Sequence, residues 1–286
     1  MSELALFGGT KVRTTAFPTY VTIGEEEQAA AARVVSKGVL SDYLGRSGPR
    51  FLGGPEVRAL EDEWCAHFGA KYAVSVNSAT SGLYAAIGAI GLRPGDEVVV
   101  SPFTMSASAT GPLVYGGKPV FADIDAKTFC LTRETIEKVL TDKTRAVVVV
   151  DLFGHPADMD PIMDLARERN LIVVEDAAQA AGSTYRGKAA GTLAHMGVYS
   201  LNVHKIIQCG EGGVVVTDDA RLAERLRLVR NHGEVIVRET NAHENADIIG
   251  FNYRMTEIEA AISREQLKKL ERFAKGFIEN TEDLHG

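Results

Sequence analysis

Short apolar runs alternate along the chain with segments whose apolar residues recur at helical spacing. Runs such as EVVVS at 97–101 and RAVVVVDL at 145–152 are apolar at consecutive positions, which indicates strands buried on both faces. This pattern favours an α/β fold, a three-layer α/β/α sandwich in which helices cover both faces of a mostly parallel sheet. The predicted strands span residues 72–77, 97–101, 118–124, 145–152, 171–176, 196–201 and 213–218, and the predicted helices span 25–37, 80–90, 132–140, 158–170, 219–231 and 255–277.

The same pattern divides the chain into three parts. Residues 1–54 are expected to form an N-terminal arm with one helix, followed by a Gly/Ser/Pro-rich loop at 41–54. Residues 55–245 contain the predicted strands and are expected to form one α/β domain. Residues 246–286 are expected to begin a C-terminal segment with a long helix that leaves the domain.

Composition and charge exclude several classes of protein. With 45% hydrophobic and 24% charged residues, the chain has the apolar content that a folded core needs, so it is not a disordered protein. Its 38 acidic and 31 basic residues give a net charge of −7, which argues against a nucleic-acid binder with a basic face. No apolar stretch approaches the ~20 residues of a membrane span, and the N-terminus lacks the apolar core of a signal peptide. We therefore expect a cytoplasmic protein that does not enter a membrane.

The cysteines and histidines indicate neither a disulfide framework nor a metal site. Cys65, Cys130 and Cys209 are scattered and form no CxxC pair, as expected for reduced thiols in a cytosolic protein. No two histidines are three or four residues apart, so none are paired on one face of a helix as metal ligands.

Candidate chemistry begins with a carboxylate and a lysine at predicted strand ends. Asp176 ends the strand 171–176, and ligands of parallel α/β sheets bind at the carboxyl ends of the strands. A carboxylate there can hold a cationic ring nitrogen or a metal ion, or simply cap the next helix. Lys205 follows the strand 196–201. In the mouth of an apolar sheet its amine would be desolvated and nucleophilic, whereas in a solvated loop it would have no special role.

Two further segments flank these residues. Residues 77–82 (NSATSG) end a strand and open a helix, where free N–H groups can bind a phosphate or where Ser and Thr serve only as caps. The glycine cluster at 210–213 matches no phosphate-binding loop and is expected to be a turn between two strands. Together, these features match what pyridoxal 5'-phosphate (PLP) needs in a binding site. The helix start at 77–82, which we call the anion cup, would bind its phosphate, the strand-end carboxylate would contact its pyridine nitrogen, and the lysine would form a Schiff base with it.

Longer motifs around these residues resemble a known family. The segments VEDAAQAAGSTYRGKAAG (174–191), YSLNVHKIIQCGEGGVVVTDD (199–219), RNHGE (230–234) and GFNYRMTEIEAAI (250–262) are similar to those of the DegT-type sugar aminotransferases. This family is a branch of the fold-type I PLP enzymes, and the resemblance runs from about residue 4 to residue 270. It implies the fold-type I large domain, with Lys205 as the Schiff-base lysine.

The resemblance also implies roles for other residues. Asp176 would contact the pyridine nitrogen, and Gln179 would lie near the 3-hydroxyl of the cofactor. Asn252 would reach the phosphate in the neighbouring subunit, so that a homodimer shares its active sites. The residues implied to bind the phosphate within the chain are Ala79, Thr80 and Ser200.

Two features depart from the family pattern. Met105 stands where the family usually places an aromatic residue over the pyridine ring, and Phe103 is an alternative for that role. Family members continue for roughly another hundred residues, the size of one small domain. The chain ends at NTEDLHG, so we expect a truncated chain in which the small C-terminal domain is largely missing.

The function that the resemblance implies is PLP-dependent transamination of a keto-sugar, in particular a nucleotide-linked one, with glutamate or glutamine as the amino donor. An aminocyclitol aminotransferase that acts on a keto-inositol is an alternative, because LALFGGTKVR at 4–13 resembles that branch as well. A PLP sugar dehydratase is disfavoured because that branch lacks the lysine that this chain has at Lys205. A catalytically inactive, truncated member with a binding or regulatory role is the alternative from a different functional class.

Overall fold

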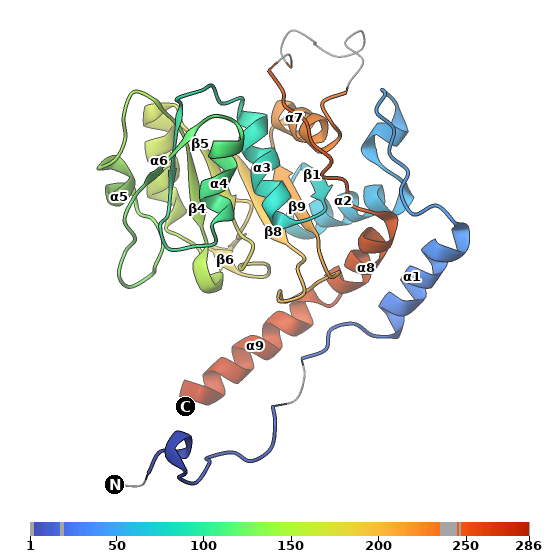
Figure 1. The fold of residues 1–286 in the computed structure, drawn as a ribbon, viewed down its shortest axis with the longest axis vertical. Coiled ribbons are helices and arrows are strands. Elements are labelled where there is room, and N and C mark those ends of the chain that lie inside the picture. Colours follow the sequence, from blue (N-terminus) through green and yellow to red (C-terminus); the bar gives the residue numbers. More distant parts are fainter. Residues whose placement is uncertain (1–2, 18–19, 235–244, 246, 286) are drawn as a thin grey trace.

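The computed structural model describes residues 3–17, 20–234, 245 and 247–285 (Figure 1). Its strands are β1 (Tyr72–Val76), β2 (Glu97–Val100), β3 (Lys118–Phe121), β4 (Thr144–Val150), β5 (Ile172–Asp176), β6 (Thr184–Tyr185), β7 (Lys188–Ala189), β8 (Met196–Ser200) and β9 (Gly213–Thr217). Its helices are α1 (Glu25–Lys37), α2 (Pro55–Phe68), α3 (Ala79–Ile90), α4 (Ala107–Val114), α5 (Arg133–Glu137), α6 (Met159–Arg169), α7 (Ala220–Arg230), α8 (Glu257–Leu267) and α9 (Leu270–His285). Within the part of the chain that the structure describes, none of these helices combines the length and apolar character that a bilayer crossing requires.

One seven-stranded sheet organises the molecule, with strand order β1-β9-β8-β5-β4-β2-β3. The neighbours from β3 to β8 run parallel, and β9 runs antiparallel to both β8 and β1. The prediction of a mostly parallel sheet in an α/β fold is therefore confirmed. Because parallel strands share their direction, β5 and β8 end at the same edge of the sheet.

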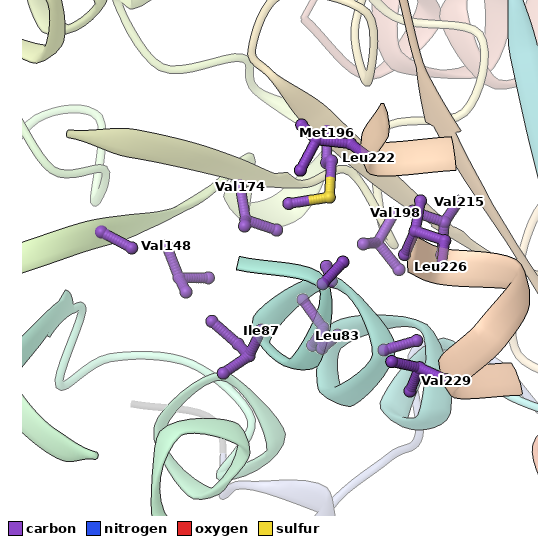
Figure 2. Packing of buried hydrophobic residues seen from close by; sticks show 14 of the residues in the cluster. Leu83, Ile87, Val148, Val174, Met196, Val198, Val215, Leu222, Leu226 and Val229 are labelled. Carbon is purple, nitrogen blue, oxygen red and sulfur yellow. The ribbon is translucent and has the colours of Figure 1, made fainter. Parts of the chain in front are cut away.

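Helices α3, α4 and α7 cover one face of the sheet, which we call the α3 face. Leu83 and Ile87 of α3 pack in one apolar cluster with Val148, Val174 and Val198 of the sheet (Figure 2). Helix α7 adds Leu222, Leu226 and Val229 to the same cluster. Alternate strand residues point to the opposite face, where they pack against α2 on one side and against α5 and α6 on the other.

Some elements of the structure were not predicted from the hydrophobic pattern. Helix α2 begins with Pro55, which is favourable in the first turn of a helix, and it buries Leu60 and Trp64 completely. Helix α4 (ASATGPLV) consists of small residues with an internal Pro112 and gives no amphipathic signal. The two-residue strands β6 and β7 form a separate hairpin that is too short to show alternation.

The long helix predicted over 255–277 is wrong, because the structure has two helices there. The backbone N–H of Lys269 donates to the carbonyl of Gln266 at 3.0 Å, a bond to the third rather than the fourth preceding residue. At this break the Gln266 amide is buried and donates to the Thr22 carbonyl and to Glu27 Oε1, both at 2.8 Å. The side chain that ties α8 to the N-terminal segment therefore lies where the helix is interrupted.

The apolar residues at the start of this segment are buried. Ala261 is fully buried where α1 packs on α8 through Ala30 and Val34. Met255 is fully buried in another cluster, with Leu201 and Ile207. The exposed apolar surface is instead on α9, where Phe277 and Ile278 are 49% and 59% exposed. These residues follow the break, and α9 extends beyond the sheet (Figure 1).

The three-part division of the chain stays a prediction. Helices α1 and α2, which lie on either side of the predicted boundary at residue 54, both pack against α8. The boundary at 245 and 246 adjoins residues 235–244 and includes residue 246, which are outside the described residues.

A buried ion pair joins α2, β1 and α7. Arg230 is completely buried and its Nη1 donates to Glu61 Oε1 at 2.5 Å. The same Glu61 oxygen accepts from the backbone N–H of Ser75 at 2.8 Å and from its hydroxyl at 2.9 Å. Removing one partner would leave the other charge buried without compensation.

We predict that Arg230→Met lowers the free energy of unfolding by about 3–5 kcal/mol, the usual cost of breaking a buried pair from one side. Replacing Glu61 by Gln in the same chain should restore a large part of this loss, because no uncompensated charge then remains. Urea unfolding of the two single variants and the double variant measures both effects. Additive losses in the double variant would contradict the coupling.

Candidate active site

Asp176 is the last residue of β5 and points to the α3 face of the sheet, in step with Val174. It is 5% exposed, and its carboxylate accepts from the Ser108 hydroxyl at 3.1 Å and from the backbone N–H of Ala178 at 3.2 Å. Ser108 lies in the first turn of α4, so this helix holds the carboxylate in place from above the sheet. The role of Ser108 was not predicted, because nothing in the motif PFTMSAS marks this residue as a partner of Asp176.

Lys205 lies in the loop that joins β8 to β9. The backbone N–H of Val203 donates to the Gly210 carbonyl, and that of Lys205 donates to the Asn202 carbonyl, both at 2.9 Å. The loop is therefore a hydrogen-bonded turn between two antiparallel strands, which confirms the role predicted for the glycine cluster. Its shape holds Lys205 half-buried, whereas the adjacent His204 is exposed.

The charges of Lys205 and Asp176 act on each other. Burial lowers the pKa of the Lys205 amine, and the negative charge of Asp176 opposes this shift. Burial likewise raises the pKa of Asp176, while its two hydrogen bonds and the charge of Lys205 oppose the rise. The site thus combines an amine that loses its proton more easily than usual with a carboxylate that gains from a nearby cation.

The start of α3 lies beside the end of β8. Ser78 caps the helix by accepting the N–H of Ser81 at 3.0 Å, and Ala79 and Thr80 form the first turn. Ser200 pairs in register with Gly213 of β9, and a Cβ atom on that glycine would lie 2.8 Å from the backbone nitrogen of Ala79. Only a glycine therefore lets the sheet approach this helix end so closely.

Lys205 lines an open cavity of about 810 Å³, together with residues of the segment that follows β5. Gln179 lines it, and the Gln179 side-chain oxygen accepts from the backbone N–H of Phe153 at 2.8 Å. The far wall comes from α9 and includes Phe277 and Ile278. This wall could not be predicted from the sequence, because the contact joins segments about 100 residues apart in the chain.

Met105 and Asn252 lie around the same site without lining the cavity. Met105 is 71% exposed, and its carbonyl accepts from the N–H of Ser108, so it precedes the helix that holds Asp176. The carbonyl of Asn252 accepts from the Asn77 side chain at 3.4 Å, next to the start of α3 in the same chain. Its side-chain oxygen accepts from Nε of Arg254 at 2.9 Å.

Two more carboxylates are buried beneath this edge. Glu175 accepts from the N–H groups of Gly191 and Leu193 at 2.6 and 2.8 Å. Burial and the neighbouring Glu175 raise the pKa of Asp151, which favours the protonated form of its carboxyl group. Across the described residues, no cluster of three or more His, Cys, Asp or Glu side chains is arranged to hold a metal ion.

Comparison with known proteins identifies the family of the chain. Residues 42–284 match the model of the DegT/DnrJ/EryC1/StrS aminotransferase family. The chain belongs to this family. The resemblance drawn from the sequence motifs is therefore confirmed, and so are the fold class and the assignment to an aminotransferase family that uses PLP.

Individual relatives differ in their acceptors. The chain is 42% identical to a GDP-perosamine synthase from Caulobacter vibrioides, over 76% of this chain and 58% of that protein. It is 35% identical to an L-glutamine:2-deoxy-scyllo-inosose aminotransferase from Streptomyces lividus, over 94% of this chain and 64% of that protein. A crystal structure of a GDP-4-keto-6-deoxymannose-3-dehydratase with a trapped PLP-glutamate geminal diamine matches with a TM-score of 0.77 and 30% identity, covering 90% of this chain and 69% of that one. The chain thus spans about three fifths of the length of these two curated relatives.

The charge interaction in this family member predicts a change in lysine reactivity. Because the Asp176 carboxylate raises the pKa of Lys205, Asp176→Asn should lower that pKa further. The rate at which an amine-reactive reagent modifies Lys205 should then rise at a lower pH than in the unaltered chain. Peptide mapping of the modified lysine across a pH series gives the pH at which the modification rate reaches half of its maximum, which is the midpoint compared here. Asp123→Asn, at an exposed position beyond β3, is the matched control and should leave the midpoint unchanged; an equal midpoint in the Asp176 variant would contradict the interaction.

Proposed function

We propose that this chain carries the cofactor site of an aminotransferase that moves an amino group from glutamate or glutamine to a keto-sugar. The observation that carries the proposal is the meeting of Asp176, Lys205 and the start of α3 at one edge of the sheet. Each supplies one of the groups that PLP needs, namely a carboxylate, an amine and an anion cup. PLP, when bound, supplies an electron sink for the carbon from which a proton is removed.

The residues of the site fit that cofactor. The free N–H groups in the first turn of α3, at Ala79 and Thr80, would hold the phosphate together with the Ser200 hydroxyl. Asp176 would hold a proton on the pyridine nitrogen, because a cation beside a buried carboxylate favours the charged form of both. Gln179 would lie near the 3-hydroxyl, and Met105 would pack its thioether against the ring.

Lys205 would attach the cofactor and would then move protons at the reacting carbon. Among the residues that the structure describes, its amine takes part in no hydrogen bond or ion pair, so it is available for both tasks. Its lowered pKa places more of the amine in the neutral form at neutral pH, and a neutral amine is both the nucleophile and the base.

The acceptor is proposed to be a nucleotide-linked keto-sugar. The GDP-perosamine synthase among the relatives supports it, whereas the 2-deoxy-scyllo-inosose aminotransferase supports a keto-inositol instead. Likeness to the dehydratase is weaker support for dehydration. The resemblance drawn from the sequence motifs implies that the dehydratase branch lacks a lysine at the position of Lys205, which this chain has. A chain without activity of its own, serving a binding role, is the remaining alternative.

A homodimer in the cytoplasm completes the proposal. Asn252 is proposed to reach the phosphate bound in the neighbouring subunit, so that two chains build each site. The scattered cysteines support a reducing compartment, because Cys65, Cys130 and Cys209 are all free thiols.

Borohydride reduction of the PLP-loaded chain tests the lysine. We expect the reduced cofactor on the peptide that contains Lys205, and Lys205→Ala should abolish covalent retention. The matched control Lys188→Ala, at an exposed position in β7, should retain the label. L-glutamate should also discharge the visible absorbance of the loaded chain, since its amino group passes to the cofactor. A label on Lys188 or on any other lysine would refute the assignment.

Mixed dimers test the shared site. In a dimer of one Lys205→Ala chain and one Asn252→Ala chain, the chain that keeps Lys205 receives Asn252 from its partner. One site in each mixed dimer should therefore bind PLP as tightly as the unaltered protein, whereas the Asn252→Ala homodimer should bind weakly. If both sites of the mixed dimer bind PLP as weakly as the Asn252→Ala homodimer, Asn252 acts within its own chain, where its carbonyl already contacts Asn77.

A further inference from the structure

Three exposed phenylalanines form a cluster at the carboxyl edge of the sheet, which we call the aromatic triad. Phe103 follows β2, Phe129 follows β3 and Phe153 follows β4, with exposures of 48%, 41% and 71%. The ring centroid of Phe103 is 5.9 Å from that of Phe129 and 6.4 Å from that of Phe153, and the last two are 6.1 Å apart. The rings therefore touch one another in tilted and edge-on contacts while their remaining surfaces face solvent.

Two of the three rings are held on strained backbone. Phe129 and Phe153 have φ values of 60° and 57°, in the left-handed region that bulky side chains rarely adopt. Tight local bonding imposes this conformation. The N–H of Phe129 donates to the Asp125 carbonyl at 2.8 Å, and the carbonyl of Gly154, next to Phe153, accepts from the Ser183 hydroxyl at 2.8 Å. Strain of this kind persists mainly where it serves a site.

The triad is continuous with the proposed active site. Phe153 lines the same cavity as Lys205 and Gln179, and its backbone N–H is bonded to the Gln179 side chain. The apolar surface of the aromatic triad therefore adjoins the part of the cavity that contains Lys205 and Gln179. A substrate with a keto carbon at Lys205 and a flat apolar part beyond it would cover both regions.

We propose that the aromatic triad binds the nucleobase of the acceptor, which makes a nucleotide-linked sugar rather than a free keto-inositol the substrate of this site. The inference rests on the proposed function. Every nucleobase has a flat face that stacks on aromatic rings, whereas an inositol ring is covered with hydroxyl groups and gains nothing from such a surface. A second copy of this chain is the competing occupant, and it would bury the same rings in an interface.

Nucleotide binding to the PLP-loaded chain tests the proposal without catalysis. Calorimetric titration with GDP and with inorganic pyrophosphate separates the contribution of the base from that of the phosphates. Phe153→Gly removes the ring and also relieves the strained backbone, so this variant should unfold at a temperature no lower than Phe153→Ala. Phe153→Tyr keeps a ring, and Phe121→Ala, at an exposed position in β3, is the control outside the triad.

We expect Phe153→Gly and Phe153→Ala to weaken GDP binding about tenfold or more, the usual value of one base stacked on one ring, with pyrophosphate binding unchanged. Phe153→Tyr and Phe121→Ala should bind GDP as the unaltered chain does. Equal binding of GDP by all variants would overturn the proposal, and so would conversion of a dimer to a monomer by Phe153→Gly in light scattering. A failure of the proposed function would be seen in a different experiment, as the absence of a cofactor label on Lys205 after borohydride reduction. In that case, titration of GDP into the chain without PLP would still measure nucleotide binding by the aromatic triad.

Discussion

The parallel sheet, apolar on both faces, is the constraint on which the rest of the structure depends. β5 and β8 begin with apolar residues, and their polar side chains come at the carboxyl end, where the parallel strands meet one edge of the sheet. Asp176 at the end of β5 and the Lys205 loop after β8 are therefore brought together by strand direction alone. Glycine at 213 then lets the start of α3 approach the same edge.

Burying charged groups at this edge has a cost, and the structure offsets it with hydrogen bonds. Asp176 has the hydroxyl of Ser108 and a backbone N–H, and Glu175 has two backbone N–H groups. Lys205 instead keeps an amine that burial pushes toward its neutral form. Asp176 and Glu175 are thus held by hydrogen bonds, whereas the amine proposed to react takes part in none among the described residues.

The site also draws on segments that are distant in the chain. Helix α9 reaches the cavity because the side chain of Gln266 ties α8 to the N-terminal segment and because Tyr20 packs its ring against Phe273 and Phe277. Strained loops bring the aromatic triad to the other side of the cavity. Rigid strand ends thus hold the reactive groups, while loops and the last helix shape what surrounds them.

The sequence by itself determined the sheet, its direction and the positions of Asp176 and Lys205, because consecutive apolar residues and strand ends are local signals. It also placed α1 over residues 25–37, where the structure has it. It did not determine α4, the break at Gln266, the cover over Met255 or the partnership of Ser108 with Asp176. These features arise from packing between residues far apart in the chain, and such packing overrides weak local propensity. Only the tertiary structure could bring Phe103, Phe129 and Phe153 together, because residues so far apart in the chain share no local pattern that would indicate contact.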